Sequence, residues 1–232
     1  MKKREAATAA EHPILFSASM VQAILDNRKD VTRRVVKGTV WCLCGHTFEE
    51  HEPGRRTLGT CTSFQMDWDK TRCPCGLPGD RLWIRETWRR RSVCSSRIAE
   101  VSTIEYRAGG PMLEVRELGT GRVTDVNWRP SLFLPRAYSR LLLTVADIRP
   151  ERLQDITDAE AIREGVLLYH GWETPEYLRQ VEAARAAGTK PPPGFSPRDR
   201  FRHLWETING PGSWARNDLV YRIEFRRFEG KA

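Results

Sequence analysis

The fold is decided by the stretch Pro78-Gly79-Asp80-Arg81-Leu82-Trp83-Ile84-Arg85. Pro-Gly-Asp is typical of a tight turn, because proline presets its own backbone angle and glycine accepts a positive φ. The five residues that follow alternate with a period of two, so Arg81, Trp83 and Arg85 share one face of a predicted strand. This arrangement favours stacking of a nucleobase on the Trp83 indole. The alternative is ordinary packing of Trp83 in the core.

Patterns elsewhere in the chain predict a mixed α+β domain. Further strands are expected at 104–107, 140–145 and 220–225. Helices are expected at 17–27, 157–165, 176–187 and 197–208, and a basic turn at 28–34. Thr157-Asp158-Ala159-Glu160 has the spacing of a capping box, which marks the start of a helix. Several short strands with few helices indicate a small β-barrel or a curled sheet with flanking helices.

Length and composition indicate a single domain. The chain has 232 residues, of which 40% are hydrophobic, enough for a sizeable core. Residues 1–12 are charged and alanine-rich, so we expect a disordered leader there and one domain over 13–232. No apolar run approaches the roughly 18 residues of a membrane span, and the N-terminus lacks the apolar stretch of a signal peptide. We therefore expect a cytoplasmic protein with no membrane partner.

The positive charge is concentrated in two segments. Residues 1–40 hold eight Lys or Arg against four acids, and residues 80–97 hold six Arg against two acids. Together they account for the formal net charge of +8. Arginines interleaved with Trp83 and Trp88 suit phosphate neutralisation and base stacking, which favours RNA, DNA or a nucleotide as partner. The alternative is a solvated basic face that only keeps the protein soluble.

Residues 41–76 are interpreted as an inserted element. They hold five of the six cysteines and few aliphatic residues, so metal binding is a natural source of folding energy for this segment. Thiolates and imidazoles at such short spacing favour a structural zinc ion with four ligands. The expected ligands are Cys42, Cys44, His51 and Cys61, with His46, Cys73 and Cys75 as substitutes. The alternative is a loop with unrelated thiols.

Several motifs of this chain occur together in one known family. They are Phe16-Ser17 with Met20-Val21, Lys29-x2-Thr32-Arg33-Arg34, the run Gly79–Trp88, Trp128-Arg129-Pro130-Ser131, Leu134-Pro135-Arg136 and the segment 204–214. With these motifs the chain resembles the phage and prophage proteins that carry an ASCH domain. The resemblance covers nearly everything except residues 1–12, the cysteine-rich segment and parts of 166–196. It implies a PUA-like β-barrel with flanking helices, a fold associated with recognition of RNA and modified nucleosides.

The resemblance also implies a possible enzymatic activity. Within the ASCH superfamily, small bacterial amidohydrolases deacylate N4-acetylcytidine with a Lys and a Thr of a K-x-x-T element and a Glu in a later helix. The matching positions are Lys29, Thr32 and Glu164. The family's glycine two residues before the lysine is Asn27 here, a departure that keeps the turn plausible because asparagine tolerates positive φ. We expect the three residues to meet in one cleft. The alternative is that Lys29 and Thr32 bind a phosphate and Glu164 is a solvated acid.

Three functions remain open from the sequence. In the first, a basic barrel cleft binds a nucleic acid or a modified nucleotide. The residues expected to contact it are Arg33, Arg34, Trp83, Arg85 and Arg136, with Trp88 as a second stacking candidate. In the second, the protein is an amidohydrolase that deacylates N4-acylated cytidine. In the third, it is a phage interaction or morphogenesis module that docks through the cysteine-rich insertion.

Overall fold

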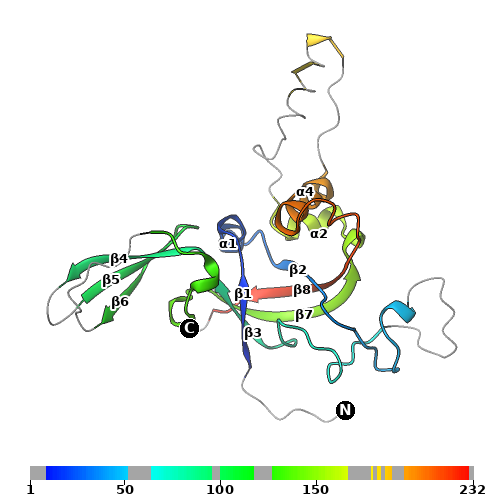
Figure 1. The fold of residues 1–232 in the computed structure, drawn as a ribbon, viewed down its shortest axis with the longest axis horizontal. Coiled ribbons are helices and arrows are strands. Elements are labelled where there is room, and N and C mark those ends of the chain that lie inside the picture. Colours follow the sequence, from blue (N-terminus) through cyan, green and yellow to red (C-terminus); the bar gives the residue numbers. More distant parts are fainter. Residues whose placement is uncertain are drawn as a thin grey trace.

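The computed structural model shows a mixed α+β protein in which strands predominate (Figure 1). The described residues are 9–51, 64–95, 100–117, 127–166, 179, 182–183, 186–189 and 196–229.

A five-stranded sheet forms the centre of the protein (Figure 1). Its strands are β1 (Glu11–Leu15), β2 (Val31–Val35), β3 (Arg81–Arg85), β7 (Leu142–Arg152) and β8 (Leu219–Arg227). They lie in the order β1-β3-β7-β8-β2; β1 runs parallel to β3, and the other neighbours are antiparallel. Within the described residues the edge strands β1 and β2 do not pair with each other, so the sheet stays open. The expected closed barrel is therefore not formed.

A second sheet projects to one side of the first (Figure 1). It consists of β4 (Trp88–Ser95), β5 (Glu100–Tyr106) and β6 (Leu113–Glu117) in consecutive antiparallel order. A small core of Trp88, Ile104, Tyr106 and Leu134 lies where β4 begins and β5 ends. The Tyr106 hydroxyl donates to the carbonyl oxygen of Tyr138 at 2.6 Å, which ties this core to the segment before β7.

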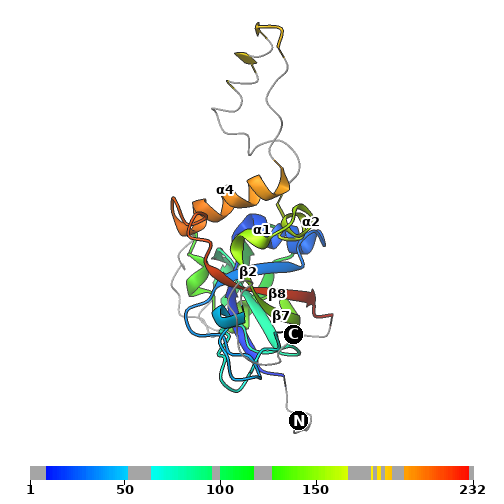
Figure 2. The ribbon, with the colours of Figure 1, turned by 90° about the vertical axis from the view of Figure 1, so that its right-hand side faces the viewer.

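Three helices lie on one side of the central sheet (Figure 2). They are α1 (Ala18–Leu25), α2 (Asp158–Arg163) and α4 (Pro197–Asn209). Each is capped by a hydroxyl that accepts a backbone N–H three residues later, from Ser17, Thr157 and Ser196 respectively. Short 3-10 helices occur at Glu49–His51, Ser131–Phe133, Arg136–Tyr138 and Leu153–Asp155.

Two apolar clusters place these helices. α1 inserts Val21 and Ile24 into the main core of the central sheet. α2 and α4 pack together over a second cluster, which contains Ala161, Phe201, Trp205 and Trp214. Because burial of such side chains contributes about 1.5–3 kcal/mol each, the two clusters fix the helices relative to the sheet.

The structure agrees with most of the predicted elements and adds others. The helices predicted at 17–27, 157–165 and 197–208 correspond to α1, α2 and α4. β1 begins inside the segment assigned to the leader, and β2 occupies part of the predicted basic turn. The helix predicted at 176–187 lies mostly outside the described residues.

Candidate functional site

Lys29 is positioned by the turn that ends α1. Asn27 adopts a φ of 56°, a conformation that asparagine tolerates better than most residues. The backbone N–H groups of Arg28 and Lys29 both donate to the carbonyl oxygen of Ala23, at 2.8 and 3.1 Å. The turn brings the backbone of Lys29 beside that of Glu164, with which it forms an isolated antiparallel bridge.

The Lys29 ammonium group is buried and held by three oxygen atoms. Its Nζ donates to Glu164 Oε2 at 2.7 Å, to the Glu164 carbonyl oxygen at 2.8 Å and to the Val31 carbonyl oxygen at 2.7 Å. The lysine side chain is 0% exposed and the glutamate side chain 4%. Burial lowers the pKa of Lys29, because desolvation disfavours the charged amine, and the Glu164 carboxylate opposes that shift. The structure thus joins two predicted catalytic residues that are 135 positions apart.

Glu164 is the C-cap of α2, and the following glycine allows its close approach to α1. Gly165 has a φ of 84°. A Cβ at this position would lie 2.8 Å from Ala23 Cβ and 3.1 Å from Lys29 Cβ. Only glycine combines this backbone conformation with this spacing, so the Lys29–Glu164 contact depends on it.

Arg33 was predicted to contact phosphates, but it is buried among carboxylates. Its side chain is 0% exposed. Its Nε donates to Glu151 at 2.7 Å, its Nη1 to Glu164 at 3.1 Å and its Nη2 to Glu160 at 2.9 Å. Because all three guanidinium nitrogens have a carboxylate partner, Arg33 orients Glu164 and is not available to a ligand phosphate. The predicted role of Arg33 is therefore corrected.

The ion pairs continue along the same face of the sheet. Arg222 of β8 donates to Glu160 at 2.9 Å, and Arg163 lies 2.9 Å from Glu224. Burial raises the pKa of Glu151, and the Arg33 guanidinium opposes that shift. The charges next to Glu164 are thus largely neutralised in pairs, which favours a neutral ligand group over a phosphate at this place.

A narrow crevice of about 60 Å³ lies beside Glu164, between α1, β2 and α4. Its lining residues are Met20, Thr32, Arg33, Arg34, Val35, Glu164, Phe201, Leu204, Trp205, Ile208 and Asn209. Thr32 is 1% exposed, and within the part of the chain that the structure describes its hydroxyl has no hydrogen-bond partner. The third predicted catalytic residue therefore lines the same crevice as Glu164, with its hydroxyl uncommitted.

Two further hydrogen-bond donors belong to residues that line the crevice, and each has an N–H group available to a ligand. The Trp205 Nε1–H group is buried and finds no acceptor among the described residues. Arg34 donates to the Leu15 carbonyl oxygen at 2.8 Å and lies 5.2 Å from the centre of the Phe16 ring. Among the described residues no carboxylate forms an ion pair with Arg34, and burial lowers its pKa. The crevice thus offers an indole N–H, and a guanidinium that forms no ion pair within the described residues, to a ligand oxygen.

The other predicted binding residues lie outside the crevice lining. Trp83 is buried, with the Arg85 guanidinium 4.6 Å from the centre of its ring. Trp88 is 3% exposed and belongs to the small core beneath β4, so it is not a stacking surface. Arg136 donates to Glu11 at 2.6 Å. Of the predicted nucleic-acid residues, Arg33 and Arg34 line the crevice, and Arg34 is the one without a carboxylate partner among the described residues.

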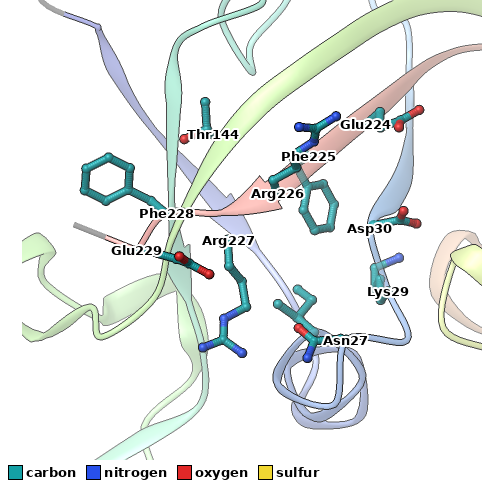
Figure 3. A pocket seen from close by; sticks show the side chains of 11 residues that line it. Asn27, Lys29, Asp30, Thr144, Glu224, Phe225, Arg226, Arg227, Phe228 and Glu229 are labelled. Carbon is teal, nitrogen blue, oxygen red and sulfur yellow. The ribbon is translucent and has the colours of Figure 1, made fainter. Parts of the chain in front are cut away.

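A larger hollow of about 650 Å³ lies between the turn after α1 and the end of β8 (Figure 3). Figure 3 shows Lys29 and Asp30 on the right, with Glu224 close to Asp30, and Arg227, Phe228 and Glu229 across from them. Two of its three lining carboxylates, Asp30 and Glu224, are held by Arg163 at 2.8 and 2.9 Å. The hollow is wide and mixed in charge, so the crevice is the more specific candidate site.

The predicted zinc ligands are described only in part. Cys61 and the side chain of His51 lie outside the described residues. Cys44 Sγ lies 3.4 Å from His46 Nδ1, close to the roughly 3.6 Å that separates sulfur and nitrogen ligands of a tetrahedral zinc. Among the residues described, no three His, Cys, Asp or Glu side chains gather as a metal site. The Cys44–His46 spacing fits two ligands of such a site.

Comparisons with protein families, with curated proteins and with solved structures give no match to this chain. No helix within the described part of the chain is long and apolar enough to cross a membrane.

Sequence reasoning missed Trp205 and the carboxylates around Arg33 as members of the site. Trp205 recurs at helical spacing with Phe201 and Leu204, a pattern that predicts core packing. Such a pattern carries no sign that one indole N–H stays unpaired. Glu151 belongs to β7 and Glu160 to α2, and only the tertiary fold brings them to Arg33.

Proposed function

We propose that the crevice is the active site of an amidohydrolase that removes the acyl group from an N4-acylated cytidine. The observation that carries this proposal is the uncommitted Thr32 hydroxyl at the crevice that is also lined by Glu164, the partner of the buried Lys29. A hydroxyl nucleophile next to groups that exchange protons is the arrangement needed for acyl transfer.

The Lys29–Glu164 pair supplies the proton transfers. In the reacting form the proton shared in the 2.7 Å hydrogen bond between Lys29 Nζ and Glu164 Oε2 has passed to Glu164 and left Lys29 as a neutral amine, a transfer that burial eases because desolvation lowers the pKa of Lys29. Thr32 Oγ1 then bonds to the acyl carbon while its proton moves to Lys29 Nζ. The C–N bond breaks as the protonated Glu164 donates to the departing cytosine nitrogen. Water next attacks the acyl-Thr32 ester, giving its proton to Glu164, and Thr32 recovers a proton from Lys29 as the carboxylic acid leaves.

Arg34 and Trp205 stabilise the charge that develops on the acyl oxygen. Donors that are preorganised in a site shielded from water are the largest single contribution to many enzymatic rates. The buried Trp205 Nε1–H has no other acceptor, and the Arg34 guanidinium has no carboxylate among the described residues. Both groups are therefore free to turn toward an oxyanion.

The size of the crevice selects the acyl group. A volume of about 60 Å³ corresponds to roughly two water-sized spaces, enough for an acetyl group and too small for a nucleobase. The base then lies at the mouth of the crevice, where Ile208 is 56% exposed. This arrangement agrees with the resemblance to ASCH-domain proteins. We therefore also propose that the open central sheet is related to the PUA-like fold.

Ligand binding without turnover is the second candidate function. Lys29 Nζ donates to three oxygen atoms, which is the full donor capacity of an ammonium group. A lysine held in that form has no lone pair with which to accept the Thr32 proton. In this case the crevice recognises the modified base and leaves it intact.

Kinetics with N4-acetylcytidine separate the two candidates. An amidohydrolase requires Lys29→Ala and Glu164→Ala each to abolish turnover, and the double variant to lose no more than either single one, because the pair acts as a unit. Glu206→Ala, at a partly exposed position on α4 that lines no part of the crevice, is the matched control and should keep the wild-type rate. Binding of intact N4-acetylcytidine without release of cytidine would assign the second function instead.

We also propose that the cysteine-rich segment holds one structural zinc ion, with Cys44 and His46 among its ligands. The 3.4 Å spacing between Cys44 Sγ and His46 Nδ1 supports this choice. His46 thereby moves from a substitute to a preferred ligand. When bound, the metal would supply folding energy to a segment that is poor in aliphatic residues.

A further inference from the structure

Trp128 is an exposed tryptophan held against two arginines at the root of the second sheet. The guanidinium carbon of Arg89 lies 4.6 Å from the centre of the Trp128 ring, and that of Arg107 lies 5.9 Å from it. The tryptophan is 38% exposed. We call Trp128 with Arg89, Arg91 and Arg107 the Trp128 face.

The backbone beside Trp128 is anchored. The N–H of Arg129 donates to the Trp88 carbonyl oxygen at 2.7 Å, and the N–H of Trp88 donates back to the Arg129 carbonyl oxygen at 3.2 Å. Leu134, a few residues later, is fully buried in the small core. The indole is therefore presented on a fixed support, which reduces the entropy lost when a ligand stacks on it.

Positive charge is left uncompensated at the Trp128 face. Arg89 and Arg91 share a single carboxylate, Glu105, at 2.6 and 3.5 Å. The Arg89 hydrogen bond holds the pKa of Glu105 below its usual range, so this carboxylate stays ionised near neutral pH. Arg91 is 64% exposed, and Arg107 forms no ion pair within the described residues. Arg89 and Arg91 thus have one carboxylate between them, and Arg107 has no ion pair among the described residues. This excess of positive charge suits a polyanionic ligand.

We propose that the Trp128 face binds a single-stranded nucleic acid, with a base stacked on the indole and phosphates near Arg91 and Arg107. Stacking on an aromatic ring together with neutralised phosphates is how proteins hold single strands. A purely apolar protein partner would leave these guanidinium groups desolvated without a counter-charge. The site stands apart from the crevice; together with the proposed function, on which this step rests, it would let the crevice act on an acylated base within a strand as well as on a free nucleoside.

Fluorescence anisotropy with labelled oligouridylate and oligodeoxythymidylate of about 20 nucleotides tests this proposal. These probes carry no acyl group, so the result is independent of hydrolysis in the crevice. Trp128→Ala should weaken binding about 5- to 150-fold, and Trp128→Phe should restore part of the loss. Arg107→Ala should reduce the slope of log affinity against log salt by about 0.7.

Phe133→Ala is the matched control. Phe133 is 64% exposed and only five residues from Trp128, but no arginine lies over its ring among the described residues. The Phe133→Ala variant should bind both probes as the wild type does. The probe that binds more tightly to the wild type shows whether the ligand is RNA or DNA. Equal losses in Trp128→Ala and Phe133→Ala would overturn the proposal in favour of an apolar docking surface for protein. Absence of binding to either probe at low salt, or tighter binding of a duplex, would overturn it as well.

Discussion

Glu164→Gln removes the charge that compensates the buried Lys29 ammonium group. Lys29 Nζ lies 2.7 Å from Glu164 Oε2, and after the change every oxygen atom within its reach is neutral. Arg33 also loses a carboxylate at 3.1 Å but retains Glu151 and Glu160. The main consequence is therefore an unpaired buried charge on Lys29.

The expected loss of stability is large. Breaking a buried ion pair by removing one partner costs about 3–5 kcal/mol. For a domain of this size each kcal/mol shifts the Tm by about 2–4 °C, so the Tm should fall by roughly 6–20 °C. Glu206→Gln is the control, because the Arg202–Glu206 pair on α4 is long at 3.9 Å and partly exposed. It should change stability by no more than about 0.5 kcal/mol.

The loss should depend on pH in a defined direction. Burial already lowers the pKa of Lys29 below its unfolded value of about 10.4, so between these two values the unfolded chain binds more protons and stability rises with pH. In Glu164→Gln the opposing carboxylate is gone, so the pKa of Lys29 falls further. The rise in stability with pH therefore begins at a lower pH than in the wild type. The loss in free energy of unfolding relative to wild type should therefore be largest below the lowered pKa of Lys29 and become smaller toward alkaline pH.

Urea unfolding followed by tryptophan fluorescence at pH 7 and pH 9.5 measures both effects. The reasoning predicts a deficit of about 3–5 kcal/mol at pH 7 that is smaller at pH 9.5. A deficit at pH 7 no larger than that of Glu206→Gln would refute the buried ion pair. A deficit that is equal at both pH values would refute the assigned titration of Lys29.

Three further predictions follow from the packing and from the cysteine-rich segment. Gly165→Ala should lower stability by at least about 1 kcal/mol in urea unfolding, because its Cβ would collide with Ala23; an unchanged midpoint would contradict this. Arg140→Met should cost about 3–5 kcal/mol in the same assay, because it leaves the buried Glu86, paired at 2.8 Å, without a counter-charge; a change below 1 kcal/mol would show that Glu86 does not need it. Elemental analysis of protein purified without added metal should find about one zinc per chain, reduced in Cys44→Ser; wild-type protein without zinc would exclude the site.

Local signals predicted the elements that frame the site. The Thr157–Glu160 capping box and the Ser17 cap are short-range hydrogen-bond patterns, and both occur in the structure. The turn at Asn27 also follows from local preference, since asparagine accepts positive φ. The meeting of Lys29 and Glu164 was an expectation from family resemblance, because no local rule relates positions so far apart.

Long-range pairing and charge compensation were not predictable from the sequence. β1 contains Pro13 and lacks a regular alternation, and it becomes a strand only by pairing with β3 at the edge of the sheet. The run Arg33-Arg34 has the composition of a solvated basic turn. The burial of Arg33 depends on Glu151 and Glu160, which reach it only after the sheet and α2 have assembled.

Release of cytidine from N4-acetylcytidine, followed by mass spectrometry with wild type, Thr32→Ser and Thr32→Ala, tests the central claim most directly. Thr32 is the proposed nucleophile, so the account predicts turnover by the wild type, slower turnover by Thr32→Ser, and none above the uncatalysed reaction by Thr32→Ala. Thermal unfolding of the three proteins checks that each is folded. Hydrolysis by Thr32→Ala at the wild-type rate, or a folded wild type that releases no cytidine, would contradict the account.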